Sequence, residues 1–191
     1  GQVLGTAFHA DLTVSFACEK LGTVLFPGSD YAGEVIPVEI GIGTKLFEEN
    51  PEVCYTLEKS DLFKFLPDRK KNSHKGSYGK ILMITGSKGM SGAAYLSARA
   101  AYISGGGLVQ IYTEESNRTI LQQLLPEAIV STYTEYEEEK LQSLLKWADV
   151  ICIGCGLGKS RTAGQILSYL MKYAEVPCVI DADGLNLLAD H

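Results

Sequence analysis

The 191-residue sequence lacks any apolar run near the ~18 residues that a membrane-spanning helix needs, and no basic segment followed by an apolar one opens it. It therefore predicts no membrane segment. It also lacks an excess of positive charge, because 17 Lys and Arg stand against 23 Asp and Glu, for a net charge of −6. This balance argues against nucleic acid or an anionic membrane as a partner.

Cysteine is scarce as well: the five cysteines are an odd number without a disulfide-like rhythm, which favours a reducing cytoplasm. Cys152 and Cys155 form a C-x-x-C pair, but a zinc site of this kind needs a second pair. Cys152 also lies in an apolar segment, where we expect it to pack as a small hydrophobic residue. An acidic protein can still bind a small anion through a local cluster of main-chain amides.

The first part of the chain differs from the rest. Residues 1–43 contain "ADLTVSF" and "VIPVEIGIG", two β-branched segments separated by the turn-rich "FPGSDYAG", and they predict the last strands of a preceding domain. Residues 44–72 are charged and interrupted by proline, and we expect a connector with a short helix at 60–65 capped by Ser60.

From Lys80 onward, short apolar segments alternate with helix-like segments. This alternation predicts an α/β fold with a parallel sheet and helices on both of its faces. The expected strands are 80–85, 108–113, 128–133, 150–154 and 177–183. The expected helices are 93–104, 114–125, 135–148, 162–173 and one that starts at 185. Gly105 stands where a glycine commonly ends a helix.

Three segments that follow predicted strands have unusual compositions: "GSKGMSG" at 86–92, "GCGLGKS" at 154–160 and "DADG" at 181–184. In an open parallel sheet, ligands bind outside the carboxyl ends of the strands. Glycine lets the main chain approach a ligand closely, and the first two segments lead into helix N-termini that suit anions. Together, the three loops predict a site for a nucleotide-like ligand.

Weaker interpretations of these residues stay open. Neither glycine segment matches the P-loop or the dinucleotide G-x-G-x-x-G pattern, so each could be only a tight turn. Asp181 and Asp183 could bind a metal ion or hydroxyl groups, or cap the next helix. His74, in "SHKGSYGK", could pack within its loop or contact a ligand.

Taken in order, the motifs "HKGSYGKILMITGSKGMSGAAYLSARAAYISGGGLVQIYT", "LLPEAI", "VICIGCGLGKS" and "CVIDADGLNLL" resemble the NAD(P)H-hydrate dehydratase family. This resemblance implies a ribokinase-like fold, of which residues 73–191 would be the incomplete N-terminal part. Cys155 stands where the family usually has proline. Residues 1–43 resemble the end of the Rossmann-like NAD(P)H-hydrate epimerase domain, with 44–72 as the linker.

The resemblance implies an ADP-dependent lyase with a magnesium-assisted nucleotide. Such an enzyme activates the ring hydroxyl of the S hydrate with a nucleotide phosphate and eliminates it, restoring NADH or NADPH. In the bifunctional enzyme this reaction is coupled to epimerisation of the R and S hydrates. The expected partners are therefore NADHX or NADPHX and an adenine nucleotide. The expected substrate-binding residues are His74, Gly92, Ala94, Gly154, Gly156, Gly158, Asp181 and Asp183.

The resemblance also indicates motifs that this sequence does not contain. The family's T-P-H-P-x-E and catalytic G-T-G-D motifs would follow His191, and the epimerase's ion-binding D-x-P-S-G would precede Gly1. We therefore expect a fragment that is inactive alone, with no catalytic residue, metal ligand or ligand for the epimerase's potassium. The full-length protein would be a cytoplasmic homo-oligomer.

Two other classes compete with this interpretation. A sugar or vitamin kinase of the same fold would also end in a G-x-G-D motif. The "HKGSYGK" opening and the epimerase-like first 43 residues favour the dehydratase, because a kinase needs neither. A non-catalytic nucleotide-binding module is the third possibility.

Overall fold

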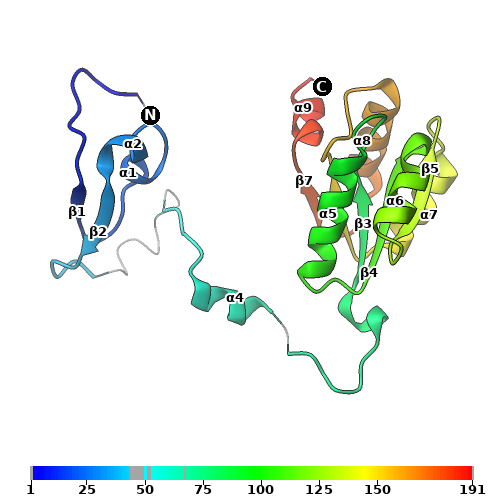
Figure 1. Ribbon diagram of the computed structural model, residues 1–191, viewed down its shortest axis with the longest axis horizontal. Helices are drawn as coiled ribbons and strands as arrows, with labels where there is room; N and C mark the ends of the chain where they lie inside the picture. Colours follow the sequence, from blue (N-terminus) through cyan, green and yellow to red (C-terminus); the bar gives the residue numbers. More distant parts are fainter. Residues whose placement is uncertain (1, 44–49, 51–52, 67, 191) are drawn as a thin grey trace. The chain divides into compact units, whose positions relative to one another are not determined.

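A computed structural model describes residues 2–43, 50, 53–66 and 68–190. The chain forms two compact units, Gly1–Pro67 and Asp68–His191, so their boundary falls inside the predicted connector 44–72. Within the described ranges, every helix is too short or too polar to cross a membrane. Figure 1 shows both units, which are described separately below.

The first unit contains two parallel strands, β1 (Leu12–Phe16) and β2 (Glu34–Val38), in register from Leu12 opposite Glu34. Two one-turn helices, α1 (Leu21–Val24) and α2 (Ser29–Ala32), connect them. Both predicted strands are confirmed. The segment "FPGSDYAG", expected to be a turn, instead includes α2.

Helix α4 (Lys59–Phe65) confirms the short helix expected in the connector, but the predicted cap was wrong. Glu58, not Ser60, is the N-cap residue, and it exchanges reciprocal hydrogen bonds with Asp61 in a capping box. Two carboxylates at a helix N-terminus are favoured by the helix dipole, which explains why the helix begins one residue earlier.

The second unit is built on a five-stranded sheet in the order β5-β4-β3-β6-β7, in which all neighbouring strands are parallel. This finding confirms the predicted parallel α/β fold. The strands are β3 (Lys80–Ile84), β4 (Leu108–Glu114), β5 (Ile129–Tyr133), β6 (Val150–Ile153) and β7 (Cys178–Ile180).

Helices connect these strands and cover both faces of the sheet (Figure 1). Several predicted boundaries moved. The largest changes are that 115–117 form a separate 3₁₀ turn, that β7 ends at Ile180 instead of residue 183, and that the helix expected from residue 135 begins at Glu138. The helical segments are η1 (Lys75–Tyr78), α5 (Ser91–Ile103), η2 (Glu115–Asn117), α6 (Arg118–Leu124), α7 (Glu138–Trp147), α8 (Arg161–Tyr173) and α9 (Asp183–Ala189).

Two apolar cores lie on opposite faces of the sheet. Leu82 and Ile84 of β3 belong to the core with α7 and α8, whereas Met83 of the same strand belongs to the core with α5 and α6. Successive side chains of a strand point to opposite faces, so a strand covered on both sides must be apolar throughout. This requirement explains the continuous run "KILMI".

Helix α5 ends as the sequence predicted. The N–H of Gly105 donates to Tyr102 O and that of Gly106 to Ala101 O, both at 2.9 Å. Gly105 has a φ of +102°, so the pattern is a Schellman motif closed by a glycine. The motif turns the chain sharply into β4.

Candidate functional site

The order of the strands creates a switch point between β3 and β6. From β3 the chain proceeds outward through β4 to β5, then returns to the other side of β3 and continues through β6 to β7. At such a point the loops that follow the two central strands diverge and leave a crevice. Here those loops are 85–90 and 154–160, the two glycine segments singled out in the sequence.

Direct hydrogen bonds join the two loops. The N–H of Gly86 donates to Cys155 O at 2.9 Å, and Ser87 Oγ donates to Gly156 O at 2.9 Å. The structure therefore brings together, at one edge of the sheet, two of the three segments that the sequence predicted to form one site.

Close packing explains two of the glycines without any ligand. Gly156 is buried with a φ of +64°, and a Cβ there would lie 2.6 Å from Ala93 Cβ. Gly154 is also buried with a positive φ, and a Cβ there would lie 1.9 Å from Asp181 O. Both positions need glycine so that their loop can pack against its neighbours.

A buried polar network fixes the β3–α5 loop from the side of β4. The Asn117 side chain, 1% exposed, donates from Nδ2 to Ser87 O at 3.0 Å and to Thr113 Oγ1 at 2.9 Å. The Thr113 hydroxyl donates in turn to Gly86 O at 3.1 Å. Sequence reasoning missed this network, although a threonine at a strand end and an asparagine before a helix are residue types that bind local main-chain groups.

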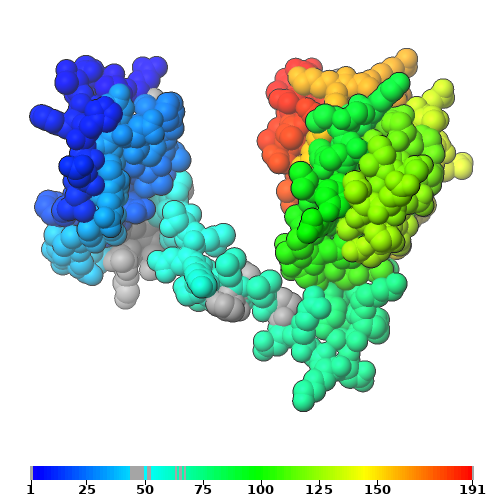
Figure 2. All heavy atoms as spheres, viewed as in Figure 1, coloured from blue at the N-terminus to red at the C-terminus, as the bar shows by residue number. Residues whose placement is uncertain are grey.

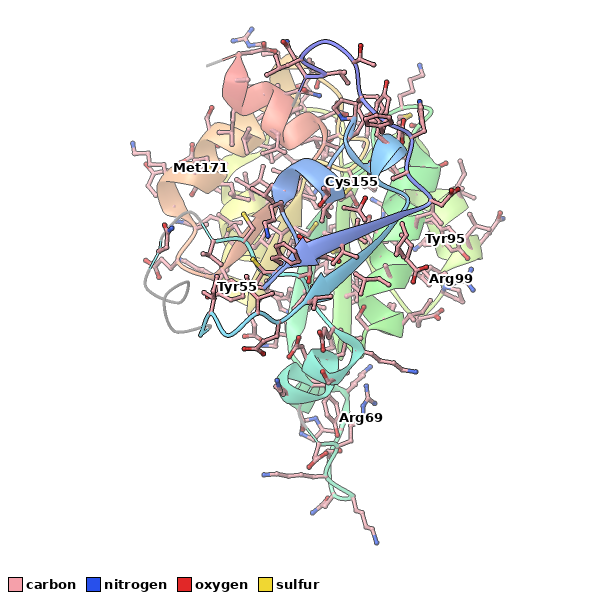
Figure 3. The ribbon with its side chains drawn as sticks, turned by 90° about the vertical axis from the view of Figure 1, so that its left-hand side faces the viewer. Tyr55, Arg69, Tyr95, Arg99, Cys155 and Met171 are labelled. Carbon is pink, nitrogen blue, oxygen red and sulfur yellow. The ribbon has the colours of Figure 1, made fainter. Side chains whose placement is uncertain are left out.

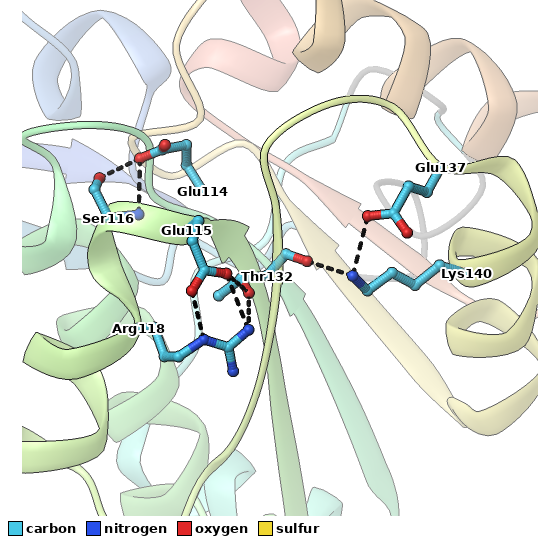
Figure 4. Close-up of polar contacts among 7 residues, drawn as sticks. All are labelled: Glu114, Glu115, Ser116, Arg118, Thr132, Glu137 and Lys140. Carbon is cyan, nitrogen blue, oxygen red and sulfur yellow. Dashed lines mark hydrogen bonds and ion pairs between the residues drawn. The ribbon is translucent and has the colours of Figure 1, made fainter.

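A charged cluster closes the neighbouring edge between β4 and β5 (Figure 4). Arg118 binds both carboxylate oxygens of Glu115, at 2.7 and 3.0 Å, and the Thr132 hydroxyl contacts both side chains. The hydrogen bonds from Arg118 and Thr132 lower the pKa of the Glu115 carboxyl to about 2. Lys140 Nζ donates to Thr132 O at 2.6 Å, which ties α7 to the same strand end.

The two aspartates after β7 have different environments. Asp183 Oδ2 accepts a hydrogen bond from the N–H of Gly158 at 2.8 Å, so its carboxylate holds the β6–α8 loop from the first turn of α9. Asp181 is exposed. Ala182 between them has a φ of +48° and a ψ of −118°, a strained conformation for a residue with a Cβ. Of these two aspartates, Asp181 is the one whose carboxylate is open to a ligand.

Two long helices begin at the same edge. Helix α5 starts after Met90, which provides no side-chain cap, whereas Ser160 caps α8 by accepting from the N–H of Ala163 at 3.1 Å. The first N–H groups of a helix lack partners within it, so the start of α5 presents donors suited to an anion. Gly92, in this first turn, is exposed and has no described atom within 4 Å of its Cβ position.

Three of the predicted site residues are placed differently from expectation. Gly92 lies inside α5, not in the preceding loop. The Ala94 methyl is fully buried in the core beneath Gly86, so it supports the loop and does not line its open side. His74 precedes β3 and therefore lies at the amino edge of the sheet, away from the glycine loops. Its main-chain oxygen accepts a hydrogen bond from the N–H of Ser77 at 2.8 Å.

Cys152 lies in β6 and packs against the core that contains Met83. Burial raises the pKa of its thiol to about 11, so it stays protonated at neutral pH. A protonated thiol is neither a good nucleophile nor a metal ligand. Cys152 therefore packs as the apolar residue expected from the sequence.

Comparisons with known proteins agree with this geometry. The family pattern described as NAD(P)H-hydrate dehydratase matches residues 81–191. The bifunctional NAD(P)H-hydrate repair enzyme of Coxiella burnetii is 38% identical over 190 residues, covering 100% of this chain and 38% of that protein. The ADP-dependent (S)-NAD(P)H-hydrate dehydratase of Lactiplantibacillus plantarum is 44% identical over 123 residues, covering 63% of this chain and 44% of that protein.

Solved structures give the same result. A ribokinase-like superfamily protein from Enterococcus faecalis superposes with a TM-score of 0.65 at 32% identity, covering 73% of this chain and 51% of that one. The ADP/ATP-dependent NAD(P)H-hydrate dehydratase of Bacillus subtilis, co-crystallised with ATP and Mg²⁺, gives a TM-score of 0.55 at 29% identity. It covers 67% of this chain and 46% of that one.

The chain thus spans less than half the length of the curated relatives it matches here. The family pattern covers more than half of the chain itself, including both glycine loops and all five strands of the sheet except the first residue of β3. By this match, the chain belongs to the NAD(P)H-hydrate dehydratase family.

Proposed function

We propose that this chain supplies the substrate side of an ADP-dependent dehydratase that converts (S)-NAD(P)H hydrate to NAD(P)H. The observation that carries the proposal is the interlocked pair of glycine loops at the switch point, joined from Gly86 to Cys155 and from Ser87 to Gly156. The names of the relatives supply the reaction, which the geometry alone would not identify.

The residues present suit a phosphate-bearing ligand. The open N-terminus of α5 and the exposed Gly92 allow close approach of an anion to main-chain donors. Lys88 is exposed in the adjoining loop and adds positive charge. We propose that Gly92, Gly158 and Asp181 contact the substrate, while the buried Gly154, Gly156 and Ala94 and the engaged Asp183 shape the loops beneath it.

Among the residues that the structure describes, magnesium finds no site built by the protein alone. The described residues contain no group of three or more His, Cys, Asp or Glu side chains that could hold a metal ion. Magnesium usually binds through substrate phosphates and few carboxylates. We therefore propose that it arrives with the adenine nucleotide, whose phosphate would supply the activation of the hydroxyl group.

We propose that the catalytic group lies in sequence beyond these residues. The relatives are more than twice as long, so a catalytic group outside these residues is compatible with their length. The first unit would belong to the epimerase, whose potassium ligands would also lie elsewhere. We place the longer protein in the cytoplasm as a homo-oligomer. The five free cysteines support the compartment, and the resemblance supports the assembly.

One experiment tests this division. Residues 1–191 and a longer natural protein that contains them are each incubated with (S)-NADPH hydrate, ADP and Mg²⁺, and the return of near-ultraviolet NADPH absorbance is recorded. We expect turnover only in the longer protein. Robust turnover by residues 1–191 would show that a residue present here carries the chemistry. Phosphorylation of a small alcohol by the longer protein, without dehydration, would favour the kinase.

A second variant tests the site itself in the longer protein. Gly92→Leu places a large side chain in open space, so we expect the fold to persist while turnover falls at least about tenfold through lost alignment. Ala100→Leu is the matched control, because Ala100 is exposed in α5 outside its first turn. Equal activity of the two variants would remove Gly92 from the site.

A further inference from the structure

The amino edge of the sheet carries a basic segment on an acidic protein. Five of the 17 Lys and Arg residues lie between 69 and 80, where the sequence "RKKNSHKGSYGK" has no carboxylate. Figure 2 shows this part of the chain projecting from the end of the second unit, and Figure 3 shows Arg69 at the end opposite Cys155. It is therefore separate from the glycine loops.

A cavity of about 420 Å³ lies in this segment. Its lining contains three permanent cations and no acidic side chain: Arg69, Lys70, Ser73, His74, Lys75, Tyr78, Gly106 and Gly107. None of the three cations forms an ion pair with a described carboxylate. Asp149, at the same edge, already accepts from the N–H of Lys80 at 2.9 Å.

Hydrogen bonds hold the walls of this cavity in place. Ser73 Oγ donates to Lys70 O at 2.7 Å and therefore accepts from Tyr78 Oη, 2.5 Å away. Arg69 lies over the Tyr78 ring, 4.4 Å from its centroid, and donates from Nη2 to Gly105 O at 3.1 Å. One donor of the guanidinium is thus used for anchoring, and its other N–H groups are available.

The cavity is distinct in charge from the larger groove along α8. That groove has a volume of about 690 Å³ and includes Lys159, Arg161 and Lys172, but Glu138 and Asp190 also line it. Lys159 already pairs with Asp190 at 3.1 Å. The cavity at the amino edge instead concentrates uncompensated positive charge around anchored walls.

We propose that the cavity bordered by Arg69, Lys70 and Lys75 binds a small anion that carries phosphate groups. Clustered Lys and Arg side chains bind phosphate oxygens through charge-assisted hydrogen bonds, and Arg can present two parallel donors. Because the net charge of the chain is −6, a local concentration of cations such as this one favours an anion against the average field of the protein. This site is independent of the proposed dehydratase function.

The test uses the 191-residue chain labelled with ¹⁵N and inorganic pyrophosphate as the probe, at about 150 mM salt, where long-range attraction is screened. We expect saturable shifts of amide signals in 69–75 and at Gly106 and Gly107. Shifts confined to 86–92 and 154–160 would place the anion at the glycine loops and overturn the proposal. Shifts that never saturate would also overturn it, because they indicate a diffuse counter-ion.

Two double variants with the same change in net charge distinguish a specific pyrophosphate site from non-specific electrostatic attraction. We expect Lys70→Ala with Lys75→Ala to weaken pyrophosphate binding at least about tenfold through lost charge-assisted contacts. Lys140→Ala with Lys159→Ala should weaken it less than about twofold, because these lysines follow the carboxyl ends of β5 and β6, at the opposite edge of the sheet, where screening limits their effect. Equal weakening would overturn the proposal. If the first pair fails to fold, the shifts in the native chain decide alone.

Discussion

The N–H of Gly86 donates a hydrogen bond to the carbonyl oxygen of Cys155 at 2.9 Å, although the two residues are 69 positions apart in the sequence. Beside it, Ser87 Oγ binds Gly156 O. The loops after β3 and β6 are therefore one hydrogen-bonded structure, and a change in either is expected to alter the other.

The first prediction compares two glycines with similar main-chain conformations, Gly156 (φ +64°) and Gly89 (φ +81°). An alanine at either position lowers the free energy of unfolding by about 1–2 kcal/mol, because its Cβ disfavours a left-handed conformation. Gly156→Ala additionally places a Cβ 2.6 Å from Ala93 Cβ. A Cβ at Gly89 would have no described atom within 4 Å beyond its own chain neighbours. Overpacking of this kind costs about a further 1–3 kcal/mol.

Denaturation with urea, followed by the fluorescence of Trp147, measures this difference because the chain's one tryptophan lies in the second unit. We expect Gly156→Ala to lower the free energy of unfolding by more than Gly89→Ala. Equal losses would mean that the β6–α8 loop moves aside freely and is not held against α5.

The second prediction concerns Asn117, the residue that sequence reasoning missed. Asn117→Ala removes the hydrogen bonds to Ser87 O and Thr113 Oγ1, so the partly buried Ser87 carbonyl and the buried Thr113 hydroxyl lose this donor. We expect the free energy of unfolding to fall by about 1–3 kcal/mol. The matched control is Asn186→Ala, because Asn186 is exposed and its Nδ2 lies 3.4 Å from Asp183 Oδ1. We expect this control to change the free energy of unfolding by less than about 0.5 kcal/mol.

The third prediction concerns acid sensitivity at Glu115. Arg118 and Thr132 lower the pKa of this carboxyl from 4.5 to about 2. A lowered pKa in the folded state means that the carboxylate stabilises the fold fully above about pH 4.5 and loses this effect as the pH falls toward 2. Glu115→Gln should therefore be less stable than the native chain at pH 6, and the difference should shrink through that window.

Glu139→Gln serves as the control for this titration, because Glu139 is exposed in α7 and forms none of the ion pairs found among the described residues. The Glu115 effect should also weaken at high salt, since the pair is partly exposed. A stability difference that stays constant from pH 6 to pH 2 would contradict the assignment of the shift to this pair.

The sequence was sufficient to predict the sheet, because a strand covered on both faces must be apolar throughout and "KILMI" has that composition. It was also sufficient to predict that the two glycine loops meet. It could not show that packing requires Gly154 and Gly156. Glycine is expected both where a neighbouring residue leaves no room for a side chain and where a ligand approaches the main chain closely.

The network around Asn117 was hidden for a related reason. Asn117 binds Ser87 O directly, and it reaches Gly86 O through the Thr113 hydroxyl. Both oxygens are main-chain atoms, so no pattern of side chains in the sequence indicates them. His74 lies at the amino edge of the sheet, and its proximity in sequence to the β3–α5 loop does not indicate which end of β3 it occupies. Motifs at opposite ends of one strand are close in sequence and far apart in the fold.

The last prediction separates the two aspartates that the sequence could not distinguish. Asp183→Ala removes the acceptor for the N–H of Gly158 and a carboxylate from the first turn of α9. We expect it to lower the free energy of unfolding by about 1–2 kcal/mol, from one lost hydrogen bond and the dipole interaction. Asp181→Ala removes an exposed side chain, so its stability should stay within about 0.5 kcal/mol of the native value.

In the longer protein we expect the opposite ranking for catalysis, with Asp181→Ala impairing activity more than Asp183→Ala. If Asp181 contacts the substrate, Asp181→Ala should lower kcat/KM for the hydrate while the urea midpoint is unchanged, and Asp181→Asn should recover part of the loss by keeping a hydrogen-bonding oxygen. Asp183→Ala should affect activity only as far as it loosens the loop at Gly158. Normal kcat/KM in a folded Asp181→Ala protein would mean that this carboxylate faces solvent throughout the reaction, and that the strained turn at Ala182 serves only to start α9.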